Sequence, residues 1–131
     1  MEEAIRQSDL PTVAALAYLG DAVHTLDIRR RAVARGLTKS GALHSFSTRY
    51  VNATAQAAML DAIEAELTED ERELCRRAAN SKHLQHPKSA SDFTYRRATA
   101  FEALLGMLSH LGRHERLCAL LDLSYDSLKG E

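Results

Sequence analysis

The stretch from Pro11 to Gly36 reads PTVAALAYLGDAVHTLDIRRRAVARG, and it sets the fold class. Proline suits the first turn of a helix, because an N–H at that position has no intrahelical partner. Apolar residues then recur at helical spacing until the glycine, where the helix is expected to end: Val13, Leu16, Leu19, Val23 and Leu26. The pattern predicts one long helix over residues 11–36.

The rest of the chain is also predicted to be helical. Further helical segments are expected over residues 42–66 (with a break near Ser47), 68–79, 92–111 and 114–123. Thr68 with Glu71 three residues later fits a capping box. Residues 80–91 are polar, contain Pro87 and read as a loop. No alternation is long enough for a strand, so the sequence predicts an all-α protein.

Length and composition predict one globular domain spanning residues 1–131. No apolar run approaches the roughly 20 residues of a membrane span, and the N-terminus lacks the features of a signal peptide. Cys75 and Cys118 lie far apart without metal-ligand spacing. We therefore expect reduced core thiols in a cytoplasmic protein without a membrane role.

The net charge of −1 hides a strong segregation. Residues 61–73 carry seven acids and one base, whereas residues 76–97 carry six bases and one acid. A local basic face can bind a phosphate backbone even on a nearly neutral chain. A solvated helix face would give the same counts, so charge alone leaves both interpretations open.

Two acids occupy unusual helical positions. Asp21 has Ala17, Tyr18, His24 and Thr25 as its i±3 and i±4 neighbours, none of which could pair with its charge. Glu102 borders the apolar stripe of the 92–111 helix and is flanked by small residues. An ionised carboxylate on a partly buried face requires compensation.

Two helices packed through these small-residue faces would bring Asp21 and Glu102 together. Close carboxylates repel unless one is protonated or a cation lies between them. Mg²⁺ fits such a position, because it prefers carboxylate oxygens and often takes further ligands from water and substrate phosphate. The alternative is that each acid lies at the solvent edge of its own helix.

Four motifs follow one another along the chain: LAYLGDAV (16–23), LHSFSTRYVNATAQAAML (43–60), RRAANSK (76–82) and TYRRATAFEALLG (94–106). Together they resemble the mini-ribonuclease III family, short relatives of ribonuclease III that lack the double-stranded-RNA-binding domain. The resemblance implies a ribonuclease III endonuclease-like helical domain that cleaves double-stranded RNA with Mg²⁺ as a homodimer. It assigns catalytic and metal-binding roles to Asp21 and Glu102.

The resemblance also implies products with 5′-phosphate and 3′-hydroxyl ends, and a role in the maturation of large-subunit (23S) ribosomal RNA precursors. A ribosomal protein is a candidate helper in choosing this substrate. Ala17 and Thr99 replace two further acids of the larger ribonuclease III pattern. Fewer protein ligands would leave more of the metal coordination to water and RNA phosphate.

Candidate RNA contacts lie in the basic segment and at the start of the helix that carries Glu102. Guanidinium, amide, hydroxyl and ammonium groups suit phosphates and 2′-hydroxyls. The expected contacts are Arg76, Arg77, Asn80, Ser81, Lys82 and Arg96. The arginines at 29, 30, 31 and 35 either extend this basic face or serve solubility.

Alternatives stay open at this point. The chain could be a non-catalytic dimeric RNA-binding protein, or a helical adaptor, although an adaptor leaves the charge segregation without a purpose. The pairs His83/His86 and His110/His114 have spacings seen among zinc ligands but lack a suitable cysteine. His24 is expected to pack or to contact the acidic site, and Phe46 or Tyr50 to be exposed for a dimer interface.

Overall fold

The computed structural model describes residues 4–81 and 91–129, and within them it is helical without strands. In chain order the elements are η1 (Gln7–Asp9), α1 (Val13–Ala34), α2 (Ser40–Thr48), α3 (Ala53–Ile63), η2 (Glu64–Glu66), α4 (Glu69–Ala79), α5 (Asp92–His110) and α6 (His114–Leu128). The predicted all-α class is confirmed. No helix in the described part of the chain has the length and apolar character needed to cross a membrane.

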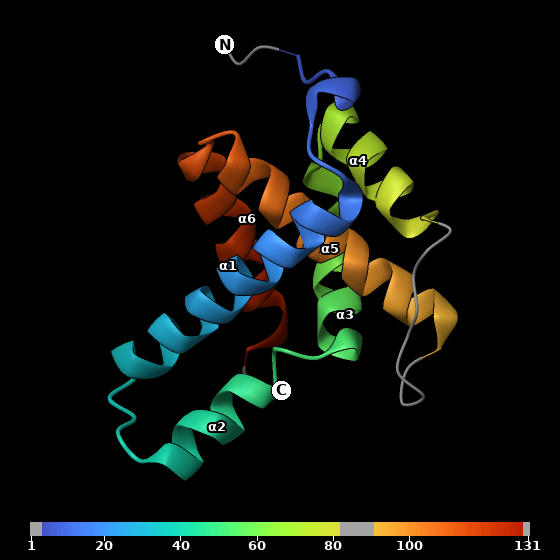
Figure 1. The fold of residues 1–131 in the computed structure, drawn as a ribbon. Coiled ribbons are helices and arrows are strands. Elements are labelled where there is room, and N and C mark those ends of the chain that lie inside the picture. The colour runs from blue at the N-terminus through green and yellow to red at the C-terminus, as the bar shows by residue number, and fades with distance from the viewer. Residues whose placement is uncertain (1–3, 82–90, 130–131) are drawn as a thin grey trace.

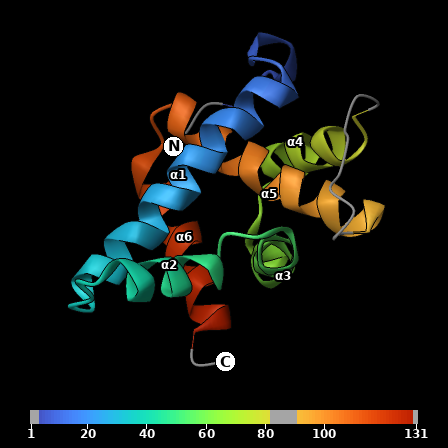
Figure 2. The ribbon, with the colours of Figure 1, turned by 60° about the horizontal axis from the view of Figure 1, so that its bottom comes forward.

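Helix α5 is the centre of the molecule. Figures 1 and 2 show α1 crossing it, with α3 and α4 nearby, and these three helices make its most extensive packing contacts. From Ala98 to Leu108 every α5 residue except Glu102 is buried. A helix that is buried on all sides must be apolar around its whole circumference, so a polar residue within this stretch is conspicuous.

The long first helix agrees with the prediction. The Thr12 hydroxyl caps α1 by accepting a hydrogen bond from the Ala15 N–H at 3.1 Å. The chain leaves the helix at Gly36, whose φ of +83° lies in the left-handed region that favours glycine. The predicted capping box at Thr68 and Glu71 is also present at the start of α4.

The predicted 42–66 segment is divided into two helices and a 3₁₀ turn. The break follows Thr48, because Asn52 begins a new helix by accepting a hydrogen bond from the Ala55 N–H at 2.8 Å. Its amide also donates to the Thr48 carbonyl, at the end of α2. This side chain therefore joins α2 to α3 at a corner.

The C-terminal helix runs about one turn beyond the predicted end at residue 123. Ser124 and Tyr125 continue its buried face, and the Tyr125 ring lies 5.2 Å from that of Tyr50. The Arg31 guanidinium lies over the Tyr125 ring, 4.4 Å from the centre of the ring. Tertiary packing stabilises a polar helix end that periodicity alone does not identify.

Two sequence-based expectations about exposure are wrong. Phe46 and Tyr50, expected at the surface for a dimer interface, belong to the buried core, where their rings lie 5.2 Å apart. Cys118, expected in the core, is exposed on α6. Cys75 is partly buried, and desolvation raises the pKa of its thiol to about 12, so it is an unreactive packing group.

Candidate active site

The site is created where α1 and α5 cross at glycines. A Cβ added to Gly20 would lie 1.6 Å from the Glu102 carbonyl oxygen, and one added to Gly106 would lie 1.9 Å from the Leu16 carbonyl oxygen. Both obstacles are backbone atoms, so neither can move without displacing a helix. The two glycines therefore permit a backbone contact that no other residue would allow.

This crossing places Asp21, the residue after Gly20, against the Glu102 side chain. The two carboxyl groups are hydrogen-bonded to each other. Asp21 is exposed, whereas Glu102 is partly buried between the helices. The predicted convergence of the two acids is present, and the alternative of two separate solvent-edge carboxylates does not hold.

The Glu102 carboxyl group is strongly perturbed. Burial in the helix crossing is the largest cause, followed by the hydrogen bond and the charge of Asp21, and together they raise the pKa of Glu102 to about 8. A hydrogen bond from Gln56 acts in the opposite direction. Without a cation Glu102 therefore keeps its proton at neutral pH.

The residues present fit a divalent cation. Glu102 keeps its proton at neutral pH, whereas a cation between the two carboxylates would neutralise both charges. Within residues 4–81 and 91–129, no three His, Cys, Asp or Glu side chains are grouped to hold a metal ion. A bound ion would thus have two acidic protein ligands, with water and substrate oxygens completing its coordination.

Gln56 is a site residue that the sequence analysis missed. It lies on α3 with 5% of its surface exposed, and its Nε2 donates to Glu102 Oε2 at 3.4 Å. The sequence does carry a signal, because Gln56 is an amide within the apolar run AQAAML. Its relevance depends on α3 packing against α5, which the local pattern does not specify.

His24 has a packing role. Its ring is 1% exposed, makes an edge contact with Phe101 at 5.3 Å and hydrogen-bonds the Tyr50 carbonyl through Nε2 at 3.0 Å. Burial lowers the pKa of His24, so the ring is neutral at pH 7. It fixes the α2–α3 corner against α1 beside the acids.

The structure gives Arg96 contacts within the protein. Its Nη1 donates to the carbonyls of Ala79 at 2.7 Å and Ser81 at 3.0 Å, and its Nε donates to Asp92 Oδ2 at 2.8 Å. The guanidinium therefore ties the first turn of α5 to the C-terminal end of α4. It fixes the chain up to Ser81 against the start of α5.

The other predicted RNA contacts follow the same edge. Arg76 pairs with Glu73 and is exposed, and Arg77 donates to Gln7 Oε1 at 2.9 Å. Asn80 is exposed at the C-cap of α4, and the Ser81 carbonyl accepts from Arg96. Lys82 lies outside the described residues. Of the predicted contacts that the structure describes, none forms a hydrogen bond or ion pair with Asp21 or Glu102.

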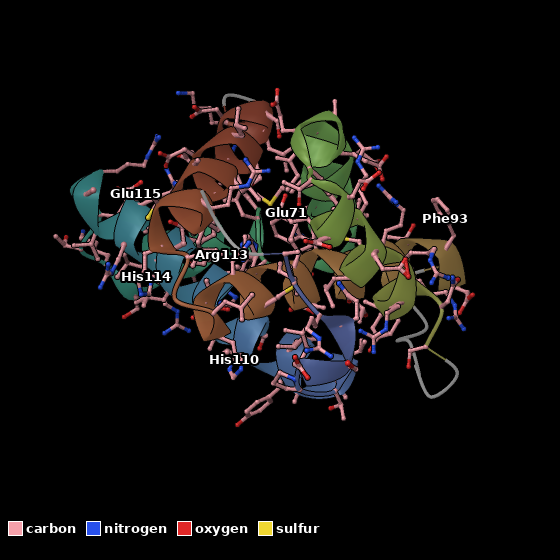
Figure 3. All side chains as sticks on the ribbon, turned by 90° about the horizontal axis from the view of Figure 1, so that it is seen from above. Glu71, Phe93, His110, Arg113, His114 and Glu115 are labelled. Atoms are coloured by element: carbon pink, nitrogen blue, oxygen red, sulfur yellow. The ribbon has the colours of Figure 1, made fainter. Side chains whose placement is uncertain are left out.

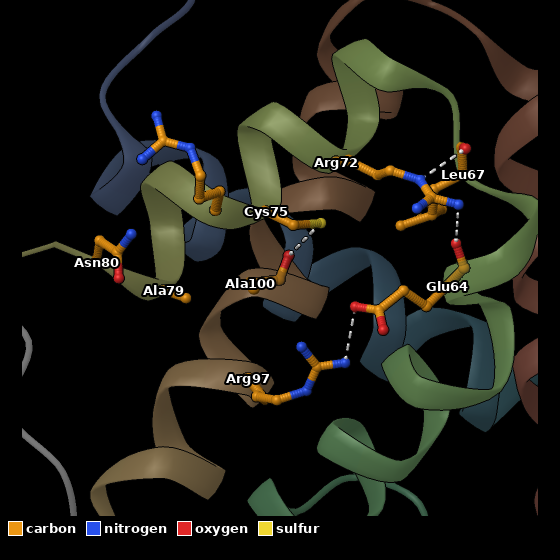
Figure 4. Close-up of a pocket in the computed structure, with 9 residues that line it drawn as sticks. Glu64, Leu67, Arg72, Cys75, Ala79, Asn80, Arg97 and Ala100 are labelled. Carbon is orange, nitrogen blue, oxygen red and sulfur yellow. Dashed lines mark hydrogen bonds and ion pairs between the residues drawn. The ribbon is translucent and has the colours of Figure 1, made fainter.

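A pocket of about 280 Å³ lies between α4 and α5 (Figure 4). Cys75 points across it to the Ala100 carbonyl, Arg97 reaches Glu64, and Arg72 donates to the carbonyls of Leu67 and Glu64. Arg97 and Ala100 are on the side of α5 opposite Glu102, at 100° per residue. The pocket is thus separate from the acid pair.

The histidine pairs do not form a zinc site in the described part of the chain. His110 and His114 are exposed near the turn between α5 and α6, beside Arg113 and Glu115 (Figure 3). No third ligand accompanies them within residues 4–81 and 91–129. His83 and His86 lie outside those residues.

The comparisons with known proteins identify the class to which this helical domain belongs. The family model for the ribonuclease III domain matches residues 14–111, a range that includes both acids and the whole crossing. The fold and site thus define an endoribonuclease of the ribonuclease III class. Within this class, the chain belongs to the mini-ribonuclease III family.

Individual relatives support the assignment along the whole chain. The Mini-ribonuclease 3 of Brevibacillus brevis is 38% identical over 130 residues, covering 99% of this chain and 97% of the relative. That of Symbiobacterium thermophilum is 43% identical over 114 residues, covering 87% and 88%. A crystal structure of a Fusobacterium nucleatum protein superposes with a TM-score of 0.82 at 27% identity, covering 94% of this chain and 98% of that one.

Proposed function

We propose that this protein is a Mg²⁺-dependent endoribonuclease that cleaves double-stranded RNA, working as a single catalytic domain. The observation that carries the proposal is the hydrogen-bonded pair of Asp21 and Glu102 at the glycine crossing. A partly buried carboxyl group with a strongly shifted pKa, such as Glu102, is typical of a functional site, because a purely structural pair of acids would destabilise the fold. Family membership agrees with this chemistry.

In this mechanism Asp21 and Glu102 are metal ligands. Mg²⁺, when bound, would supply a water of lowered pKa and neutralise charge on the phosphoryl oxygens. Glu102 would hold the ion after losing its proton, and Asp21, which is exposed, would offer its oxygens from the solvent side. The expected products carry 5′-phosphate and 3′-hydroxyl ends.

Duplex RNA is recognised mainly through its shape, its phosphates and its 2′-hydroxyls. We assign this contact to the edge where α4 ends and α5 begins. The residues concerned are Arg76, Arg77, Asn80, Ser81, Lys82 and Arg96. Arg96 would act largely by positioning this edge, because its guanidinium holds the carbonyls of Ala79 and Ser81.

The proposed substrate is a precursor of large-subunit (23S) ribosomal RNA in the cytoplasm, with a ribosomal protein as a candidate helper. Support comes from the mini-ribonuclease relatives and from a fold that offers shape and charge recognition. A structured precursor provides the duplex that such recognition requires.

We further propose that the active form is a homodimer built on α1. One face of this helix exposes Tyr18, Leu26 and Val33, which are 85%, 53% and 66% exposed. With Ala22 and Arg29 they lie within about 80° of the helix circumference. An apolar stripe of this length on a surface helix is typical of a contact with another protein.

A second copy of this chain fits the stripe. Tyr18 and Val33 are about 22 Å apart along α1, and the point midway between them is next to Leu26. A two-fold axis there would set Tyr18 of each copy beside Val33 of the other. Val33 borders a pocket of about 300 Å³ between α1 and α2, lined by Arg29, Ala32, Val33, Leu43, His44 and Ser47, which could receive a tyrosine ring.

This dimer would place the two acid pairs on either side of the interface, because Asp21 follows Tyr18 by one helical turn. The backbones of a duplex are also related by approximate two-fold axes, so each site could cut one strand. The proposed interface would therefore cover apolar side chains and also arrange the two acid pairs for cleavage of both strands.

The alternative function is a non-catalytic, dimeric RNA-binding protein. It is favoured by the small number of acids, since position 17 is alanine and position 99 is a buried threonine. Binding without Mg²⁺-dependent cleavage would identify this alternative.

The test is incubation with duplex RNA, with and without Mg²⁺, followed by mapping of the cut ends. We expect cleavage only with Mg²⁺, leaving 5′-phosphates. Asp21→Asn should bind the duplex normally yet lose at least about 100-fold in cleavage rate, because it removes a metal ligand. Undiminished cleavage by this variant would reject the role of Asp21.

A further inference from the structure

Gln56 occupies a position that folding alone does not explain. The other buried residues of α3 are apolar: Ala55, Met59, Leu60 and Ile63. This helix packs against α5, and the Gln56 side chain is 5% exposed. Burying an amide is unfavourable unless hydrogen bonds replace those that it makes with water.

The hydrogen bond that Gln56 makes with Glu102 is long. Its Nε2 lies 3.4 Å from Glu102 Oε2, beyond the usual range of about 2.7–3.2 Å, so it offsets little of the desolvation. A methionine or leucine would fill similar space in an apolar interface at no such cost. The amide is therefore explained by what it faces, the Glu102 carboxyl group.

We propose that Gln56 is a positioning residue for the divalent ion, a role that rests on the proposed function of Asp21 and Glu102. The Glu102 side chain has three rotatable bonds, and a ligand that must be ordered on binding weakens the interaction. The amide on α3 holds one Glu102 oxygen from one side, while Asp21 contacts the carboxyl group from α1. Three helices thus fix the orientation of one carboxylate before an ion arrives.

The primary test is Mn²⁺ binding to metal-free protein without RNA, measured by titration calorimetry. Gln56→Met keeps the size of the side chain and removes the donor, and we expect it to weaken Mn²⁺ binding about tenfold. In duplex cleavage, kcat at a fixed, subsaturating Mg²⁺ concentration should fall while KM for RNA stays unchanged. Met59→Leu, one turn along α3, is the matched control for altered packing and should match wild type.

A double-mutant cycle separates positioning from general packing. In the Glu102→Gln background, Gln56→Met should cause no further loss of Mn²⁺ affinity, because the group through which it acts is gone. Gln56→Asn keeps an amide but is too short to reach Glu102, so it should behave like Gln56→Met. Additive effects in the cycle would overturn the proposal.

The outcomes distinguish this inference from the proposed function. Wild-type protein that neither binds Mn²⁺ nor cleaves RNA would reject the proposed function itself. Wild-type protein that does both, with equal Mn²⁺ affinity in Gln56→Met, would reject the role of Gln56 alone. If Gln56→Met and Gln56→Asn both fail to fold, the amide is required for folding and the proposal is wrong.

Discussion

At the scale of single residues, Glu102 shows how a fold changes the acidity of a carboxyl group. Its carboxyl group is hydrogen-bonded to Asp21 and keeps its proton near neutral pH because burial and the neighbouring charge disfavour the anion. A divalent ion bound at the proposed site would reverse this preference by binding the deprotonated pair. Metal binding and proton release would therefore be linked there.

The first prediction concerns this linkage. With the pKa of Glu102 at about 8, metal binding at pH 7 should release about one proton. Apparent Mg²⁺ affinity should rise about tenfold per pH unit from pH 6 to 8 and level off above that. Calorimetry in buffers of different ionisation enthalpy measures the proton count. A pH-independent affinity across this range would show that Glu102 does not hold a proton that metal binding displaces.

A second prediction concerns stability in the absence of metal. Because the pKa of Glu102 is raised on folding, the folded state binds more protons than the unfolded state between about pH 4.5 and 8. Its contribution to stability is therefore lost as the pH rises through that window. Glu102→Gln should be more stable than wild type by on the order of 2 kcal/mol at pH 9, with little difference at pH 4.

Urea unfolding at the two pH values, with a chelator present, measures this difference. The control variant is Ser124→Ala, which alters a buried polar side chain on α6. The stability difference between this variant and wild type should not depend on pH. Equal stability of Glu102→Gln and wild type at pH 9 would show that the acid pair is not strained.

At the scale of elements, the α1–α5 crossing is the determining contact. Gly20 lies one residue before Asp21, and Gly106 lies one turn after Glu102, so the glycines that allow the crossing also place the acids. Each Cβ would meet a backbone oxygen, which a side-chain rotation cannot relieve. Gly20 and Gly106 therefore determine both the close packing of α1 on α5 and the positions of the two acids.

The prediction at this scale is that Gly106→Ala is strongly destabilising, although alanine is the better helix former. Overpacking against the Leu16 carbonyl should lower the free energy of unfolding by about 3 kcal/mol. Gly41→Ala is the matched control, because no atom lies within 4 Å of its added Cβ; it should stabilise by up to about 1 kcal/mol. Chemical denaturation of both variants checks the comparison, and a neutral Gly106→Ala would argue against the close crossing.

At the scale of the whole molecule, the feature that suggests a partner is the exposed apolar stripe on α1. Tyr18, Leu26 and Val33 lie on the helix that carries Asp21 but face away from α5. The proposed dimer would cover these residues and bring two acid pairs to one surface.

The prediction for the dimer uses Leu26, which lies next to the proposed two-fold axis. Leu26→Glu would bring two like charges together and should raise the dimer dissociation constant at least about 100-fold, as measured by sedimentation. Phe93→Glu is the control, because Phe93 is 73% exposed but lies on α5, away from the stripe. A wild-type protein that sediments as a monomer at micromolar concentration would contradict the dimer.

Much of the fold is predictable because its signals are local. Helical spacing, Gly36 and the Thr68–Glu71 box depend on neighbours within one or two turns, and they predict the helices to within a few residues. The end of α6 is not predictable in this way, because the last turn is stabilised by the contacts of Tyr125 with Tyr50 and Arg31, which are distant in sequence. The burial of Phe46 and the exposure of Cys118 depend on the same kind of distant contact.

The sequence by itself determined the helical class, the helix starts and the two unusual acids, since each depends on residue type and spacing along one helix. Only the tertiary structure decided that Asp21 meets Glu102, that Gln56 on a third helix joins them, and that Arg96 is used within the protein. The physical reason is that the free energy of a carboxyl group depends on burial and on charges brought close in space. Those quantities exist only once α1, α3 and α5 have packed together.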